Sequence, residues 1–119
     1  MDFKKLANQY RDELLDNVLP FWLEHSQDIE FGGYFSCLDR EGKVFDTDKF
    51  IWLQGREVWM FSMLYNKVEK RQEWLDCAVQ GGEFLKKYGH DGNYNWYFSL
   101  DRSGRPLVEP YNIFSYTFA

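Results

Sequence analysis

The sequence lacks the features that mark several common functional classes. Its two cysteines, Cys37 and Cys77, form no metal-binding pattern, so reduced thiols in a cytoplasmic protein are the default expectation. It has no basic patch: 19 acidic residues outnumber 14 lysines and arginines, and the net charge of −5 disfavours nucleic acid and anionic membranes as partners. No apolar run is long enough to span a bilayer, and no apolar segment follows Lys4 and Lys5 as in a signal peptide. With no phosphate-cradling glycine loop either, we expect no metal and no cofactor.

Aromatic residues, by contrast, are abundant, at 20% of the chain with 5 tryptophans and 8 tyrosines. Tryptophan and tyrosine bury a large area while keeping a polar tip. Such side chains often line cavities that bind sugars and other small polar molecules. The alternative explanation is a core that is simply rich in aromatics.

The most informative segment is 49–65, which has a helical pattern that is apolar on nearly every face. A helix without a polar side is expected to be buried. Arg56 lies near its middle, and a buried arginine is costly unless it is paired or serves a site. We therefore predict an interior helix whose guanidinium faces a polar cavity. An internal salt bridge of Arg56 with Glu57 or Asp48 is the structural alternative.

The other segments alternate between helical and hairpin patterns. Asp2 is expected to cap the first helix, which Pro20 kinks or ends, and Thr47 or Asp48 is expected to cap the apolar helix. The glycine pair at 81–82 inside a helix indicates close packing against a neighbour. The predicted elements besides the apolar helix at 49–66 are an amphipathic helix at 2–25, a hairpin at 33–45, a second amphipathic helix at 70–88, a hairpin at 97–106 and the start of another apolar helix at 111–119.

The two hairpins resemble each other. Asp39 and Asp101 are 62 residues apart, as are Gly42 and Gly104, so a unit of amphipathic helix, hairpin and apolar helix occurs twice. Amphipathic outer helices around apolar inner helices are what a closed double ring requires, and six units of 62 residues would need about 372 residues. We therefore predict that residues 1–119 are an N-terminal fragment of a single all-α domain, covering about its first two helix pairs. A small independent helical domain is the alternative.

Several motifs, in their order along the whole chain, resemble the N-acylglucosamine 2-epimerase family, which includes renin-binding proteins and cellobiose 2-epimerases. They are Gly32-Gly33-Tyr34-Phe35, Leu38-Asp39-Arg40-x-Gly42, Trp52-Leu-Gln-Gly-Arg56 with Trp59, and Glu109-Pro110-Tyr111-Asn112-Ile113-Phe114-Ser115. The resemblance implies an (α/α)6 barrel with short β-hairpins between outer and inner helices. It also implies an isomerase that interconverts N-acetylglucosamine and N-acetylmannosamine, through removal of the C2 proton and an enediolate.

The resemblance also implies roles for particular residues. Arg56 matches the family's active-site arginine and is expected to hold and polarise O1 and O2 of the open-chain sugar, because a guanidinium stays charged and offers several donors in one plane. Trp52, one helical turn earlier, is positioned to stack on the sugar. Tyr111, Asn112 and Ser115 begin the next inner helix and are expected to reach the same cavity.

The two histidines, His25 and His90, do not match the family's catalytic histidines, which are implied to lie later in the barrel. The isolated fragment is therefore expected to be inactive. Alternatives remain open: an aldose–ketose isomerase or cellobiose 2-epimerase of the same fold, a non-catalytic partner-binding protein that associates, for example as a homodimer, through exposed apolar edges, or an (α/α)6 glycoside hydrolase. The last would need a carboxylate pair, and no spacing singles one out among Asp46, Asp48, Glu57, Asp91 and Glu109.

Overall fold

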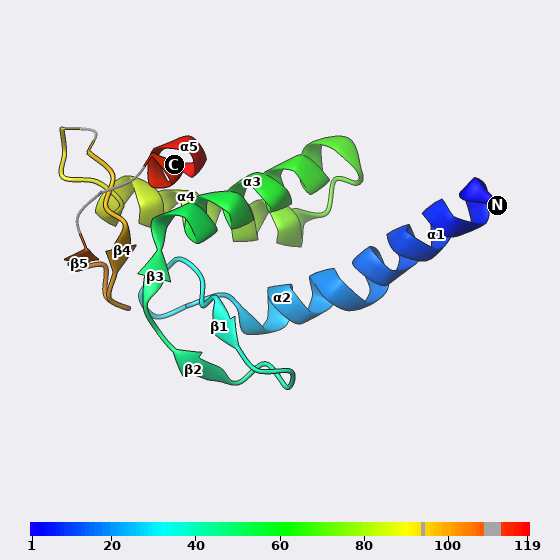
Figure 1. Ribbon diagram of the computed structural model, residues 1–119, viewed down its shortest axis with the longest axis horizontal. Coiled ribbons are helices and arrows are strands. Elements are labelled where there is room, and N and C mark those ends of the chain that lie inside the picture. The colour runs from blue at the N-terminus through cyan, green and yellow to red at the C-terminus, as the bar shows by residue number, and fades with distance from the viewer. Residues whose placement is uncertain (94, 109–112) are drawn as a thin grey trace.

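The computed structural model describes residues 1–93, 95–108 and 113–119, which are mostly helical with short strands (Figure 1). No helix in these ranges is both long and apolar enough to cross a membrane. In chain order the elements are α1 (Phe3–Glu13), a π-helical segment (Leu14–Val18), α2 (Leu19–His25), β1 (Cys37–Leu38), β2 (Val44–Asp46), β3 (Lys49–Phe50), α3 (Ile51–Lys67), α4 (Gln72–Tyr88), β4 (Ser99–Leu100), β5 (Pro106–Val108) and α5 (Phe114–Phe118).

The first helical rod runs without a break from α1 through the π-helical segment into α2. Asp2 caps it as predicted, because its carboxylate accepts a hydrogen bond from the Lys5 N–H. Pro20 does not end the rod, which stays helical to His25. Instead the hydrogen-bond register widens just before it, where the Leu19 N–H bonds to the Leu14 carbonyl five residues back.

The apolar stripe of α1 faces solvent. Phe3 is 73% exposed and Tyr10 is 70% exposed, and no residue of α1 is buried. The amphipathic pattern predicted from the sequence is present, but nothing in the described part of the chain covers its apolar side.

The core lies mainly between α3 and α4, which are joined by a short connection and lie side by side (Figure 1). The sequence predicts that Trp74, Ala78, Phe84, Leu85 and Tyr88 form the inward face of α4; the first four are buried and Tyr88 is half-buried. One buried cluster joins Trp74, Cys77 and Ala78 of α4 to Leu19, Tyr34, Phe61 and Leu64. A second contains Ile51, Phe84, Leu85 and Leu100.

Both predicted hairpins form, and β1 pairs with β2 as β4 pairs with β5. One pairing was not predicted: β3 adds to β4, which gives a three-stranded sheet in the order β3-β4-β5. Because Lys49 and Phe50 are extended in this sheet, α3 begins at Ile51, whose N–H bonds to the Phe98 carbonyl. The predicted cap by Thr47 or Asp48 is therefore wrong, and α3 has no side-chain cap.

The repeat seen in the sequence is also present in the structure. The turns Asp39–Lys43 and Asp101–Arg105 have the same backbone hydrogen bonds, and Gly42 and Gly104 adopt φ values of +83° and +94°. At both glycines a side chain would collide with the ring that ends the preceding helix, His25 or Tyr88. The two units therefore join helix to hairpin in the same way.

Candidate functional site

Within the described chain, helix α3 is buried on one side; burial of its other side was predicted for a ring larger than residues 1–119. Its buried residues are Ile51, Gln54, Gly55, Phe61 and Leu64. Arg56 is exposed and Trp59 is 63% exposed. The described chain supplies packing partners to α3 mainly from α4 and α5, so the opposite side of this apolar helix stays open.

Trp52 and Arg56 lie on one face of α3, as their spacing predicted, and both approach the ring of Phe118 on α5. The ring centroids of Trp52 and Phe118 are 6.1 Å apart, and the Arg56 Cζ lies 5.8 Å from the Phe118 ring centroid. Gly55 lies between them in the sequence, and any side chain there would collide with the Phe118 carbonyl. The glycine thus lets the two apolar helices come close.

The remaining predicted site residues are only partly described. Ser115 on α5 is fully buried, and its Oγ has no hydrogen-bond partner among the described residues. Tyr111 and Asn112 lie outside the described residues, as does Glu109. The structure therefore brings two of the five predicted site residues together and places a third on the adjoining helix.

Arg56 and Glu57 also line a pocket of about 260 Å³ between α2 and α3. Glu57 does not pair with Arg56; its carboxylate accepts a 2.6 Å hydrogen bond from the Ser26 hydroxyl. Burial raises the pKa of Glu57 to about 7, although this hydrogen bond opposes the shift. The pocket is lined by Val18, Trp22, Ser36, Leu53, Arg56, Glu57, Trp59 and Met60.

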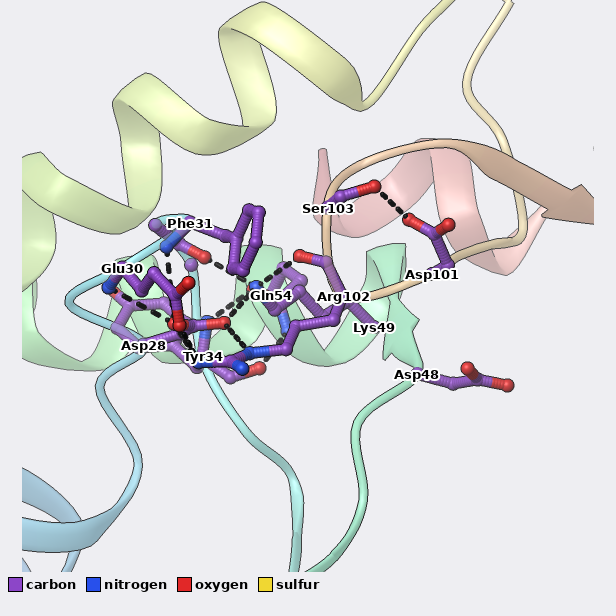
Figure 2. Close-up of polar contacts among 12 residues, drawn as sticks. Asp28, Glu30, Phe31, Tyr34, Asp48, Lys49, Gln54, Asp101, Arg102 and Ser103 are labelled. Carbon is purple, nitrogen blue, oxygen red and sulfur yellow. Dashed lines mark hydrogen bonds and ion pairs between the residues drawn. The ribbon is translucent and has the colours of Figure 1, made fainter.

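Neither predicted local salt bridge of Arg56 forms in the described part of the chain. Glu57 is turned to Ser26, and Asp48 points away from the neighbouring polar cluster (Figure 2). Among the described residues the Arg56 guanidinium therefore has no ion-pair partner, and it lies over the Phe118 ring.

Two glutamines hold the glycine-rich loop that follows α2. The Gln54 side chain donates to the Tyr34 carbonyl and accepts from the Tyr34 N–H, both at 2.8 Å. Gln80 makes the matching pair of bonds with Gly33. Gly33 adopts a φ of +74°, and a side chain there would meet Gln54 and Phe84. Gln54 in the Trp-Leu-Gln-Gly-Arg motif is therefore structural, whereas Arg56 two residues later is open.

A buried ionic cluster joins the same loop to the second hairpin (Figure 2). Lys49 is completely buried, and its ammonium donates to the Asp28 carboxylate at 2.9 Å, the Gly32 carbonyl at 2.6 Å and the Arg102 carbonyl at 2.9 Å. All three ammonium protons are thus used. The Arg102 guanidinium binds both Asp28 oxygens, at 2.9 and 3.1 Å, and also pairs with Glu30.

The electrostatics of this cluster are set by competition. Burial raises the pKa of Asp28, but the hydrogen bonds from Arg102 and Lys49 outweigh it and bring the pKa down to about 2. Burial also lowers the pKa of Lys49, against the effect of Asp28. Sequence reasoning missed this cluster. The available signal was the repeat, because Asp28 and Asp91 occupy matching positions after α2 and α4.

His25 is the last residue of α2, and His90 follows Gly89, which caps the end of α4. His25 packs on Phe21 at 4.9 Å between ring centroids, and His90 packs on Trp96 at 5.0 Å. Of the candidate carboxylates, Asp46 and Asp91 are exposed, and Glu57 is the one with a raised pKa among those described. No group of three metal-binding side chains gathers within the described ranges.

Comparison with known proteins identifies the family. The family model for N-acylglucosamine 2-epimerase matches residues 33–119. The N-acylglucosamine 2-epimerase of Mus musculus is 48% identical over 111 residues, which cover 90% of this chain and 26% of that protein. The enzyme of the same name from Homo sapiens is 47% identical over 108 residues, or 87% of this chain and 25% of the relative.

A solved structure agrees with this result. The cellobiose 2-epimerase of Bacillus thermoamylovorans superposes with a TM-score of 0.78 at 32% identity, over 88% of this chain and 27% of that one. The chain therefore spans about a quarter of the length of these relatives. By its family match and its sequence identity, the chain belongs to the N-acylglucosamine 2-epimerase family.

Proposed function

We propose that the intact protein is an N-acylglucosamine 2-epimerase, which inverts C2 of a reducing N-acyl sugar, and that this chain supplies the first two helix pairs of its (α/α)6 barrel. The observation that carries the proposal is the 48% identity to a relative of that name over 90% of the chain. The identity to the cellobiose 2-epimerase structure is lower, at 32%.

The open side of α3 supports this arrangement. In a closed double ring, α3 and α5 are inner helices, while the first helical rod and α4 are outer helices. The exposed Arg56 and Trp59 then face the central cavity instead of solvent.

The chemistry assigns this chain a binding and electrostatic role. Removal of the C2 proton from the open-chain N-acyl sugar forms an enolate with its negative charge on the O1 oxygen, because C2 carries an acylamino group and no hydroxyl. Arg56 stabilises that charge by donating from a fixed, permanently charged plane. Trp52 stacks against the sugar, and Tyr111, Asn112 and Ser115 contribute polar contacts from the next inner helix.

Proton transfer itself requires two acid or base groups on opposite faces of C2, a role for which histidine has a suitable pKa. His25 and His90 are engaged at the ends of outer helices and are not assigned this role. The 119-residue chain prepared alone is therefore expected to be inactive. Measurable epimerisation by the purified 119-residue chain would contradict that part of the proposal.

The test is an assay of the intact protein with N-acetylmannosamine and with cellobiose, following the C2 epimer by NMR. Turnover of N-acetylmannosamine with little turnover of cellobiose is expected. Arg56→Ala is expected to lower kcat/KM by about 10²–10³, the usual cost of losing one donor to a developing oxyanion. Arg105→Ala, a highly exposed arginine on the second hairpin, is the control and should leave kcat/KM unchanged.

Preference for cellobiose would assign the protein to the other branch of the family. No epimerisation of either sugar by the intact protein would overturn the proposed reaction. An Arg56→Ala variant with nearly full activity would leave the reaction in place but remove Arg56 from the site.

A further inference from the structure

The ionic cluster at Asp28 joins one repeat unit to the next. Asp28 follows α2 in the first unit, whereas Arg102 lies in the hairpin turn of the second. The Arg102 guanidinium lies 5.0 Å from the Phe31 ring and 5.3 Å from the Phe35 ring, so aromatic faces from the first unit flank it. An arginine on a buried carboxylate thus helps to hold the second hairpin to the first unit (Figure 2), together with the pairing of β3 and β4 and the bond from Lys49 to the Arg102 carbonyl.

Each half of this link has a counterpart at the matching position of the other unit. Arg40 precedes Arg102 by 62 residues and follows Asp39 as Arg102 follows Asp101. Arg40 is exposed and makes no ion pair with any described residue. Its turn has the same backbone hydrogen bonds as the turn that carries Arg102. The first hairpin therefore presents the same arginine without a carboxylate opposite it in the described chain.

The carboxylate half is repeated too. Asp91 follows Asp28 by 63 residues and comes directly after the turn that ends α4. Asp28 accepts from the N–H groups of Glu30 and Phe31, and Asp91 accepts from those of Asn93 and Asn95. Asp91 differs in being exposed, with no lysine or arginine bound to it among the described residues.

Strand pairing shows the same difference between the two hairpins. In the second hairpin, β4 is the central strand, with β5 on one side and β3 of the preceding unit on the other. In the first hairpin, β1 pairs with β2, and no other described strand pairs with β1. Within the described chain, the β1 edge therefore has no second strand beside it and Arg40 has no carboxylate, and both lie on the same hairpin. A single neighbouring unit that supplies a strand and a carboxylate would account for both.

The geometry points to a docking surface formed by Arg40 and the open edge of β1, which receives another helix–hairpin unit of the same design. That unit contributes a carboxylate at the position of Asp28 and a short antiparallel strand at the position of β3. Asp91 is the complementary half, and it receives the arginine of a further hairpin turn. The inference rests on the closed ring of the proposed function. In such a ring the last unit lies next to the first, so Arg40 and the β1 edge would contact the last unit and close the ring.

Two physical arguments favour this occupant over another ligand. The surface formed by Arg40 and the β1 edge requires a partner with a carboxylate in a tight turn and a strand two residues long nearby. The first unit presents both features to the second, as Asp28 and β3. A guanidinium on a buried carboxylate is also oriented by two parallel bonds, so the pair fixes the angle between units as well as holding them together.

The test measures hydrogen exchange and urea unfolding in the intact protein with substitutions in the first hairpin. Arg40→Glu is expected to speed exchange of the backbone amides in the peptide covering residues 35–43 on the order of tenfold and to lower the unfolding midpoint, because it replaces the cation with a like charge. Lys43→Glu makes the same charge change three residues later in the same turn. Lys43 is exposed and has no ion pair among the described residues, so this control should change neither measurement.

Arg102→Glu calibrates the effect, because it breaks the link that the structure shows. It should speed exchange in the peptide covering residues 97–105 by a similar factor. Asp91→Lys should destabilise the protein as Arg40→Glu does, whereas Glu83→Lys on the exposed side of α4 should not.

Equal behaviour of Arg40→Glu and Lys43→Glu would overturn the inference, as would rapid exchange of the β1 amides in the unmodified intact protein. This failure is separable from failure of the proposed function. If the β1 amides exchange rapidly but epimerase activity is normal, only the proposed docking surface is wrong. Protection at β1 that depends on Arg40, in a protein without epimerase activity, removes only the reaction.

Discussion

Arg56 and Glu57 are neighbours in the sequence, yet their side chains lie in different environments. The Arg56 guanidinium is exposed on the open side of α3, and the Glu57 carboxylate is turned towards α2 and the Ser26 hydroxyl. Consecutive residues on a helix are separated by about 100°, so one can serve a cavity while the other packs inside. Two neighbouring residues thus lie in two environments, one open and one enclosed.

The raised pKa of Glu57 makes stability depend on pH. Its pKa is about 7 in the folded chain against an ordinary value of 4.5. Between pH 4.5 and 7, the folded state therefore keeps a proton on Glu57 that the unfolded chain has released. Stability should therefore fall as pH rises from about 4.5 to 7. We expect Glu57→Gln to remove this decline and to stabilise the protein at pH 8 by roughly 1–3 kcal/mol.

Urea unfolding at pH 5 and pH 8 measures the effect, with the exposed Glu83→Gln on α4 as the matched control. The control should keep the slope of the unmodified protein. If Glu57→Gln keeps the same slope, Glu57 is ionised in the folded protein and the assignment is wrong.

The sequence predicts which residues share a helix face more directly than how exposed each of them is. Trp52 and Arg56 were expected to share a face, and they do, because helical spacing is a local property. Arg56 is exposed in this chain. Its predicted place in a cavity enclosed by further segments stays a prediction, because an apolar helix is buried only where other segments cover it. The role of Gln54 could not be predicted from its motif, because its side chain bonds to the backbone of Tyr34, which the fold brings close from 20 residues earlier in the chain.

Among the elements, α4 carries the clearest test of packing, because it contains two adjacent glycines with opposite surroundings. A side chain at Gly81 would collide with the ring and hydroxyl of Tyr34, whereas nothing lies within 4 Å of one at Gly82. The prediction of close packing for this glycine pair is thus confirmed at the first position only. Tyr34 is anchored there, because its hydroxyl donates to the Cys77 carbonyl at 2.7 Å.

We expect Gly82→Ala to raise the free energy of unfolding by about 0.5–1 kcal/mol, because alanine lowers the backbone entropy of the unfolded chain at a helical position that has room for it. We expect Gly81→Ala to lower it by about 1–3 kcal/mol through overpacking against Tyr34. Urea denaturation of the two variants side by side makes each the control of the other. A Gly81→Ala variant as stable as Gly82→Ala would contradict the packing of Tyr34 on α4.

Elements whose signals are local could be predicted, and those that depend on distant pairing could not. The hairpins followed from their turn residues, since Gly42 and Gly104 both adopt the positive φ that the turns require. Strand β3 is two residues long and forms only because β4, far along the chain, lies next to it. The start of α3 was misplaced for the same reason.

At the scale of the whole molecule, the described chain has a covered side and an open side. α3 and α4 share a core, but the apolar stripe of α1 and the exposed Trp59 lie outside it. An apolar surface of this extent on one chain favours association. The repeat, which sequence self-similarity revealed, explains why: a unit of this kind is covered by its neighbours.

We therefore expect the 119-residue chain prepared alone to bind an apolar fluorescent dye and to self-associate at micromolar concentrations. Size-exclusion chromatography with light scattering measures this directly, and Phe3→Ser combined with Tyr10→Ser should reduce it by removing two exposed aromatics from α1. Replacing the exposed polar Asn8 and Gln9 with serine is the matched control. A clean monomer that does not bind the dye would contradict the open-sided arrangement.

The enclosure of Lys49 also bears on covalent labelling. Its amine has no exposed surface, and its protons are held by two parts of the chain: the Asp28 carboxylate and Gly32 carbonyl of the loop after α2, and the Arg102 carbonyl of the second hairpin. An acylating reagent can reach this nitrogen only after those segments separate. The rate at which label appears on Lys49 therefore measures how often the two units separate at this contact. Label on exposed lysines shows only that the reagent is present.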